Sequence, residues 1–143
     1  MPIHVDHVVL WVEDPRAALD FYVKVVGLSA VRGDEFIAGN APFPSVRVSE
    51  HSILDLMPAM AAPFAGAFTG EKKPTAAGKP MNHVCLAMDR GEFEALAGRL
   101  AERAVPTFRA GERSFGARGS SRHWFYFQDP DGNMIEARHY EEG

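Results

Sequence analysis

The chain has 143 residues, of which 46% are hydrophobic and 24% charged, so it is long enough to bury one core and has the composition of a globular domain. Its net charge of −4, with scattered Lys and Arg, offers no basic stripe and argues against nucleic-acid binding. No apolar run reaches the roughly 18 residues of a membrane span, and the single Cys85 has no internal disulfide partner, so we expect a cytoplasmic protein.

The N-terminal segment predicts a strand followed by a helix. From Ile3 to Val12, β-prone residues place apolar side chains on both faces, so we expect a strand that is covered on both sides. Asp14 then offers an N-cap and Pro15 a first helical position, and apolar residues recur at helical spacing until Gly27. This pattern predicts a helix of about three turns.

Short β-prone runs follow, separated by Gly, Asn and Pro. They predict strands near residues 30–32, 35–38, 45–49 and 52–57. From Pro58 to Pro80 the composition changes to Ala, Pro, Gly and Lys without a sustained period, which predicts a connection.

The second half follows a similar plan. Its patterns predict a strand over residues 81–88, an amphipathic helix over 90–103 and the start of a strand at 105–108. The segment 111–121, rich in Gly, Ser and Arg, predicts a mobile loop. The turn sequence DPDGN at 129–133 joins two extended runs and predicts a closing β-hairpin.

The chain contains an internal repeat. The run DHVVL at residues 6–10 is echoed by NHVCL at 82–86, and ILDL at 53–56 is echoed by MIEA at 134–137. The two histidines lie 76 residues apart and the two acidic residues 81, so one loop insertion reconciles the copies. We infer two copies of a β-α-β-β-β unit, each with a histidine on its first strand and a carboxylate on its last.

This arrangement resembles the vicinal oxygen chelate superfamily, which includes glyoxalase I, bleomycin-resistance proteins and extradiol dioxygenases. The likeness rests on the first histidine followed by Asp-Pro, on the second-copy His83, and on DPDGN with Glu136 three residues further on. It implies an α+β fold whose mixed sheets form a half-open barrel, and a homodimer that takes a small-molecule substrate. The implied organisation is a single domain over 1–143, with βαβββ modules at 1–60 and 81–143 and a connecting loop at 61–80.

The resemblance assigns His7, His83 and Glu136 as ligands of a divalent metal ion, which could be Fe(II), Mn(II), Zn(II), Ni(II) or Co(II). Two imidazoles and a carboxylate suit a catalytic ion because they leave coordination positions open. Strand alternation places each residue among apolar neighbours, where a charge is costly unless it is paired or metal-bound. The alternative is a member that keeps the frame and binds its ligand without metal.

Three further residues each have two interpretations. Asp55 stands where glyoxalase I-like members carry a fourth ligand, but Asp is one methylene shorter than Glu and a structural salt bridge is equally compatible. Tyr126 matches a tyrosine that hydrogen-bonds substrate oxygen near the metal, or it is an aromatic residue of the hairpin core. Arg138 shares the face of Glu136 and could hold a substrate carboxylate or phosphonate, or form a salt bridge at the rim.

These features predict a metal-dependent enzyme of the glyoxalase/dioxygenase group that acts on a small oxygen-rich substrate by lyase, isomerase or ring-cleaving chemistry. No branch is matched in full, because Val9 replaces a threonine of the fosfomycin branch and His123 is the nearest substitute for an additional histidine of the extradiol branch. The alternative is a dimer of the bleomycin-resistance type, which binds a drug without turnover.

Overall fold

The structure is a computed structural model that describes residues 5–59 and 81–140. The chain forms two compact units. Unit 1 contains Met1–Pro80 and Pro130–Asn133, and unit 2 contains Met81–Asp129 and Met134–Gly143. The predicted connecting loop at 61–80 lies outside the described residues.

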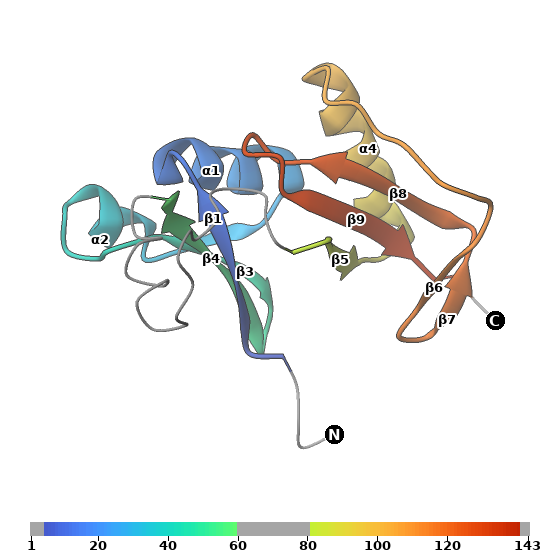
Figure 1. Cartoon of the computed structure of the whole chain (residues 1–143), viewed down its shortest axis with the longest axis horizontal. Helices are drawn as coiled ribbons and strands as arrows, with labels where there is room; N and C mark the ends of the chain where they lie inside the picture. The colour runs from blue at the N-terminus through green and yellow to red at the C-terminus, as the bar shows by residue number, and fades with distance from the viewer. Residues whose placement is uncertain (1–4, 60–80, 141–143) are drawn as a thin grey trace, which may run out of the picture. The chain divides into compact units, whose positions relative to one another are not determined.

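Unit 1 contains a four-stranded mixed sheet in the order β1-β4-β3-β2 (Figure 1). Strand β1 runs parallel to β4, whereas β4 with β3 and β3 with β2 are antiparallel. The strands are β1 (His7–Val12), β2 (Ser29–Val31), β3 (Ser45–Ser49) and β4 (Ser52–Pro58). The first strand of the unit therefore lies directly beside the last.

Helix α1 (Pro15–Phe21) begins where the sequence predicts. The side chain of Asp14 accepts hydrogen bonds from two backbone amides of the first turn, and Pro15 occupies the first helical position. The helix continues as a π-helical segment η1 (Tyr22–Val26), and Gly27 ends it in the left-handed conformation with φ 91°. The two segments together form the helix of about three turns that the spacing predicts.

Two predictions for unit 1 are wrong. Residues 35–38, predicted as a strand, overlap helix α2 (Gly33–Ile37), whose first turn carries two acidic residues that stabilise a helix N-terminus. Strand β1 is not covered on both sides, because Leu10 and Val12 are buried while Val9 on the other face is 44% exposed. Alternation of apolar residues identified the strand but not how many of its faces are covered.

Unit 2 contains a three-stranded sheet in the order β5-β9-β8, in which β5 runs parallel to β9 and β9 antiparallel to β8. The elements are β5 (Val84–Ala87), α4 (Arg90–Glu102), β8 (His123–Gln128) and β9 (Met134–His139). Helix α4 packs on one face of this sheet, where the ring of Phe93 lies 5.0 Å from that of Phe125 (Figure 1). The other face carries Tyr126 and Glu136, which are paired across β8 and β9.

The predicted closing hairpin is present, and its turn, Pro130–Asn133, belongs to unit 1. There Asp131 Oδ1 accepts a hydrogen bond from the backbone N–H of Glu13 at 3.0 Å. Asn133 Nδ2 donates to the backbone oxygen of Trp11 at 3.1 Å. The DPDGN sequence thus makes a turn and also binds the end of β1.

The segment 111–121, predicted as a mobile loop, contains a short antiparallel hairpin of β6 (Ser114–Gly116) and β7 (Gly119–Ser121). Buried Ser121 Oγ donates to the backbone oxygen of His139 at 2.6 Å and so joins the hairpin to β9. This bond links residues 18 positions apart, so local composition could not predict it.

No strand forms at residues 105–108, where a single bridge pairs Phe108 with Tyr126. The α+β class with mixed sheets is confirmed, and none of the three sheets in the described residues is a closed barrel. None of the helices in the described part of the chain is long and apolar enough to cross a membrane.

Candidate functional site

In unit 1, His7 and Asp55 lie side by side on the parallel strands β1 and β4. Asp55 is paired with Val9, two residues after His7, so both side chains lie on one face of the sheet. The distance from His7 Nε2 to Asp55 Oδ2 is 4.0 Å. Asp55 is buried, and its other oxygen, Oδ1, accepts a hydrogen bond from Ser45 Oγ at 2.7 Å. Ser45 therefore holds the carboxylate with one oxygen toward the imidazole.

Unit 2 contains the same arrangement. Glu136 on β9 is paired with Cys85 on β5, two residues after His83. His83 Nε2 lies 3.3 Å from Glu136 Oε1. The other oxygen, Oε2, lies 3.3 Å from Ser114 Oγ and also accepts hydrogen bonds from Arg138. In both units, a serine and the strand register present one carboxylate oxygen to a histidine Nε2.

The residue before each histidine orients its ring. His7 Nδ1 lies 2.8 Å from Asp6 Oδ2, and His83 Nδ1 lies 2.7 Å from Asn82 Oδ1. Both oxygens are acceptors, so Nδ1 carries the hydrogen and donates it in each case. Each neutral imidazole then has its lone pair on Nε2, the nitrogen that faces the carboxylate. Such a bond on the far ring nitrogen is typical of metal-binding histidines.

A lone pair and a carboxylate oxygen repel each other unless a proton or a cation lies between them. The protonated form of the His7 imidazole is therefore favoured. The hydrogen bond to Asp6 raises the pKa of His7 above 6.5, and the charge of Asp55 acts in the same direction. The unit 1 pair is therefore a place that attracts positive charge.

Of the three predicted ligands, His83 and Glu136 belong to unit 2 and His7 to unit 1. The structure brings His83 together with Glu136 and His7 together with Asp55. Within the residues that the structure describes, no group of three or more His, Cys, Asp or Glu side chains could hold a metal ion. By donor chemistry, each pair offers one imidazole nitrogen and one carboxylate oxygen, and both suit a divalent transition ion.

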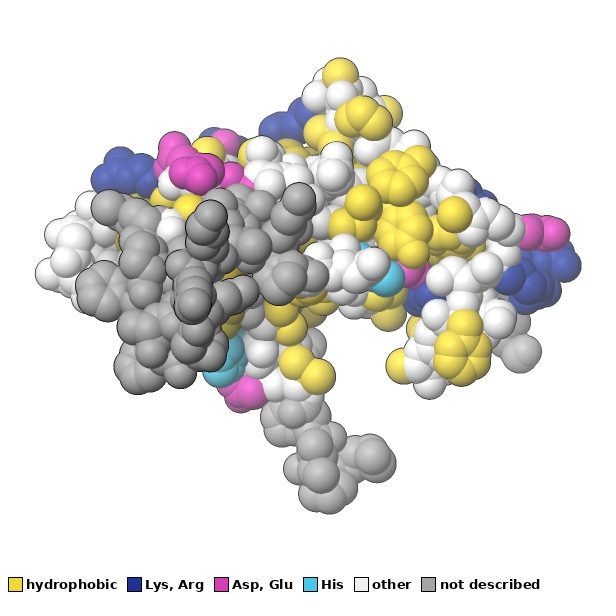
Figure 2. All heavy atoms as spheres, viewed as in Figure 1, with side chains coloured by type: hydrophobic (Ala, Val, Ile, Leu, Met, Phe, Trp, Pro, Cys, Tyr) yellow, Lys and Arg dark blue, Asp and Glu magenta, His cyan; other side chains and the backbone are white. Residues whose placement is uncertain are grey.

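Tyr126 belongs to a cluster of aromatic side chains beside His83. Its ring meets that of His83 edge-on at 5.2 Å and lies 5.4 Å from Phe108 and 5.3 Å from Trp124. We call Phe108, Trp124 and Tyr126 the aromatic wall. Phe108 is 45% exposed, and Figure 2 shows hydrophobic side chains gathered over this region of β8 and β9. Phe108 and the half-buried Tyr126 of this wall offer a surface for a flat apolar group next to a histidine, whereas Trp124 is buried.

Arg138 is only 2% exposed, and its guanidinium is engaged within unit 2. It donates to Glu136 Oε2, to Ser114 Oγ and to the backbone oxygens of Ser114 and Phe115. Burial is the largest single influence and lowers the pKa of Arg138, but hydrogen bonding to Glu136 and Cys85 and the charges of these two groups together raise it. A substrate anion would have to displace these partners to reach the charge.

His123 does not lie with Glu136. It is paired with His139 across β8 and β9, and the two rings stack at 4.2 Å. His139 also contacts Phe93 of α4, so this pair lies on the helix-covered face of the sheet. His123 therefore cannot stand in for the additional extradiol histidine on the face of Glu136.

Sequence analysis missed four residues that orient the two pairs: Asp6, Asn82, Ser45 and Ser114. A signal for two of them was present, because the internal repeat places a polar residue with an acceptor oxygen directly before each histidine. The serines carried no such signal. Ser45 is 10 residues from Asp55 in the sequence and Ser114 is 22 residues from Glu136, so the fold alone brings each serine to its carboxylate.

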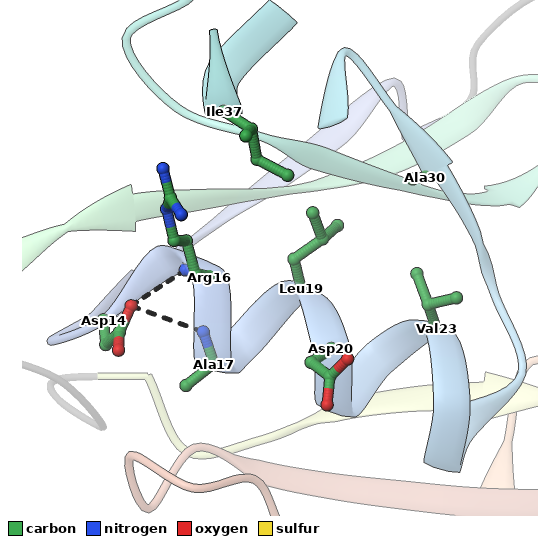
Figure 3. Close-up of a pocket in the computed structure, with 8 residues that line it drawn as sticks. All are labelled: Asp14, Arg16, Ala17, Leu19, Asp20, Val23, Ala30 and Ile37. Atoms are coloured by element: carbon green, nitrogen blue, oxygen red, sulfur yellow. Dashed lines mark hydrogen bonds between the residues drawn. The ribbon is translucent and has the colours of Figure 1, made fainter. Parts of the chain in front are cut away.

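Unit 1 also contains a pocket of about 550 Å³ (Figure 3). It is bounded by α1, β2 and α2, and its lining residues are Asp14, Arg16, Ala17, Leu19, Asp20, Val23, Ala30 and Ile37. Neither His7 nor Asp55 lines it. Asp14 is occupied there as the helix cap and Asp20 by an ion pair with Lys24, so the pocket is mainly apolar.

A family model of the Glyoxalase/Bleomycin resistance protein/Dioxygenase superfamily matches residues 4–137. The chain belongs to this superfamily. The match spans both histidine–carboxylate pairs and confirms the resemblance seen in the sequence. Superfamily members commonly use divalent metal ions and bind small molecules. No curated protein matches the chain.

Several solved structures have a similar fold. A glyoxalase/dioxygenase from Nostoc punctiforme is 23% identical with a TM-score of 0.66, covering 97% of this chain and 92% of its own. A lactoylglutathione lyase from Agrobacterium tumefaciens is 21% identical with a TM-score of 0.63, covering 96% and 94%. The antibiotic-binding protein TnmS3 from Streptomyces is 23% identical with a TM-score of 0.61, covering 99% of both chains. At these identities the likeness shows the fold alone.

Proposed function

We propose that the protein is a metal-dependent enzyme of the glyoxalase/dioxygenase group, in which His7, His83 and Glu136 hold one divalent ion. The observation that carries this proposal is the matched orientation of the two pairs. Each histidine donates from Nδ1 to its preceding residue and presents Nε2 to a carboxylate oxygen. Each pair presents an imidazole nitrogen and a carboxylate oxygen of the kind that a divalent ion binds, and the superfamily resemblance assigns His7, His83 and Glu136 to one ion.

The ion, when bound, would polarise neighbouring oxygens of a small chelating substrate. The chain's own residues would orient that substrate. Tyr126 lies against His83, where its hydroxyl could hydrogen-bond a substrate oxygen, and Asp55 could serve as a fourth ligand or hold His7 in place. Lyase, isomerase and ring-cleaving reactions all use this chemistry. The metal could be Fe(II), Mn(II), Zn(II), Ni(II) or Co(II), and the assembly a homodimer.

The second candidate is a binding protein that holds a drug or similar small molecule without turnover. The aromatic wall favours it, since Phe108 is 45% exposed beside Tyr126 and can stack on a flat ring. An antibiotic-binding protein is among the structures with this fold, as is a lyase. The two candidates differ in whether a metal is required.

The test measures metal content and affinity in the purified protein and in His7→Ala, His83→Ala and Glu136→Gln variants. We expect one divalent ion per chain in the wild type, with a lower melting temperature after EDTA treatment. Each variant should lose affinity by at least about 100-fold, because the loss of a ligand exceeds the 10- to 100-fold effect of removing an outer partner.

His51→Ala is the matched control, because His51 is exposed and lies near Glu50 rather than in either pair. It should keep the metal content of the wild type. A wild type that binds no divalent ion yet retains a planar aromatic ligand would support the binding protein instead. Equal metal affinity in all four variants would refute the assigned ligands.

A further inference from the structure

We propose that Arg138 is a positioning residue for the candidate metal site: together with the β6–β7 hairpin it fixes Glu136 so that only Oε1 is available to a cation. This inference rests on the proposed function. In this role Arg138 holds the metal ligand Glu136 and does not itself contact substrate.

The contacts divide the two oxygens of Glu136 between different partners. Oε2 accepts from Arg138 Nε at 3.1 Å and Nη2 at 2.5 Å, and lies 3.3 Å from Ser114 Oγ. Oε1 instead faces His83 Nε2 at 3.3 Å. With Oε2 occupied by three donors, the carboxylate can offer a cation only Oε1. The arginine thus sets the rotation of the carboxylate and its ligation through one oxygen.

The hairpin in turn fixes the arginine. Arg138 Nη1 donates to the backbone oxygen of Ser114 at 3.1 Å, and Nη2 donates to that of Phe115 at 3.1 Å and to Ser114 Oγ at 2.6 Å. The guanidinium lies over the ring of Tyr140, 5.5 Å from its centre. These bonds leave a long side chain with one conformation, which a surface arginine does not have.

Gly116 permits this close packing. A Cβ atom added there would overlap the guanidinium of Arg138 and lie 2.6 Å from the hydroxyl of Tyr140, so the hairpin or the arginine would have to shift. The backbone of Gly116 is not in the left-handed region, so the absence of a side chain is what matters. The glycine is required by the arginine beside it.

The experiment compares divalent-ion affinity, measured with Zn(II) or Co(II) against a competing chelator, in wild type and Arg138→Lys. Lysine keeps the positive charge but cannot donate in a fork to Glu136 and the hairpin together. We expect the affinity to fall by about 10- to 100-fold while the fold is kept. Ser114→Ala and Gly116→Ala should lower it in the same direction, because they disturb the same bonds without removing the charge.

Arg118→Lys is the matched control, since Arg118 also lies over Tyr140, at 4.9 Å, but has no bond to Glu136. It should bind the ion like the wild type. If Arg138→Lys and Ser114→Ala both retain wild-type affinity, the positioning role is overturned and the metal site stands. If the wild type itself binds no ion, the proposed function is refuted, and the positioning role of Arg138 is refuted with it. If Arg138→Lys does not fold, the Ser114 and Gly116 variants decide the question.

Discussion

The thiol of Cys85 lies on the face of the unit 2 sheet that carries the candidate site, directly across from Glu136. Cys85 as a whole residue is exposed, but its thiol is partly buried, and this burial raises the pKa of Cys85 to about 11. The charge of Glu136 acts in the same direction, and Arg138 opposes it. A thiol in this setting is a poor nucleophile near neutral pH, because only the thiolate reacts.

We therefore predict slow alkylation of Cys85 in the metal-free protein. Near pH 8 about one thiol in a thousand is ionised at a pKa of about 11, compared with about a quarter at the ordinary value of roughly 8.5. Iodoacetamide should react on the order of 100-fold more slowly than with the same chain unfolded in guanidinium. Glu136→Gln removes an anion, so the midpoint of the pH–rate profile should fall. A wild-type midpoint near 8.5 would contradict the assigned environment.

At this scale, the sequence singled out the histidines and carboxylates of the two pairs but not the side chains that hold them. The repeat located both histidines and both acids, because strand alternation and a recurring motif are local signals. The partners Ser45 and Ser114 became visible only when the strands were paired. Arg138 was expected near a substrate, but its burial depends on a hairpin that begins 24 residues earlier.

At the scale of elements, the turn between β8 and β9 depends on the backbone freedom of Gly132. Its φ is 84°, and an added Cβ would meet no atom within 4 Å, so a larger residue there is strained but not crowded. Gly132→Ala should lower the free energy of unfolding by about 1 kcal/mol, from conformational strain alone. Gly132→Asn should keep most of the stability, because Asn tolerates the left-handed region. Urea denaturation measures both.

Gly98→Ala should change the free energy of unfolding in the opposite direction to Gly132→Ala. Gly98 lies inside α4, has open space around it and does not have positive φ. Alanine there should stabilise the protein by about 0.5 to 1 kcal/mol. If both alanine variants shift stability in the same direction, backbone conformation is not the cause.

The elements that the sequence predicted correctly have strong local signals. The cap at Asp14, the stop at Gly27 and the DPDGN turn each depend on the intrinsic preferences of a few residues. The segment 35–38 was misassigned because a short apolar run fits both helix and strand. The β6–β7 hairpin was missed because its bonds to β9 are made by side chains and not by a sheet.

At the scale of the whole molecule, the two histidine–carboxylate pairs differ in charge. In unit 1, His7 has two carboxylates beside it, those of Asp6 and Asp55, and the hydrogen-bond donor to Asp55 is the neutral Ser45. In unit 2, the residue before the histidine is the neutral Asn82, and the charge of Glu136 is balanced by Arg138. The carboxylates of Asp6 and Asp55 therefore favour the protonated form of His7, and a metal ion would compete with the proton for His7 Nε2.

Asp6→Asn should make the unit 1 pair resemble that of unit 2, because Asn keeps an acceptor for Nδ1 and removes a charge. The hydrogen bond to Asp6 is the largest cause of the raised pKa of His7, followed by the charge of Asp55. We expect NMR titration of the metal-free variant to give a His7 pKa closer to 6.5 than in the wild type.

The same change should alter how metal affinity depends on pH. A protonated imidazole cannot bind metal, so as the pH is lowered the metal affinity of the wild type should begin to fall at a higher pH than that of the variant. Protonated His7 also stabilises the folded protein, because its pKa is higher in the folded state than in the unfolded chain. This stabilisation is fully present below pH 6.5 and is lost as the pH rises through the raised folded-state pKa. Identical titration curves for wild type and variant would show that Asp6 does not act on His7.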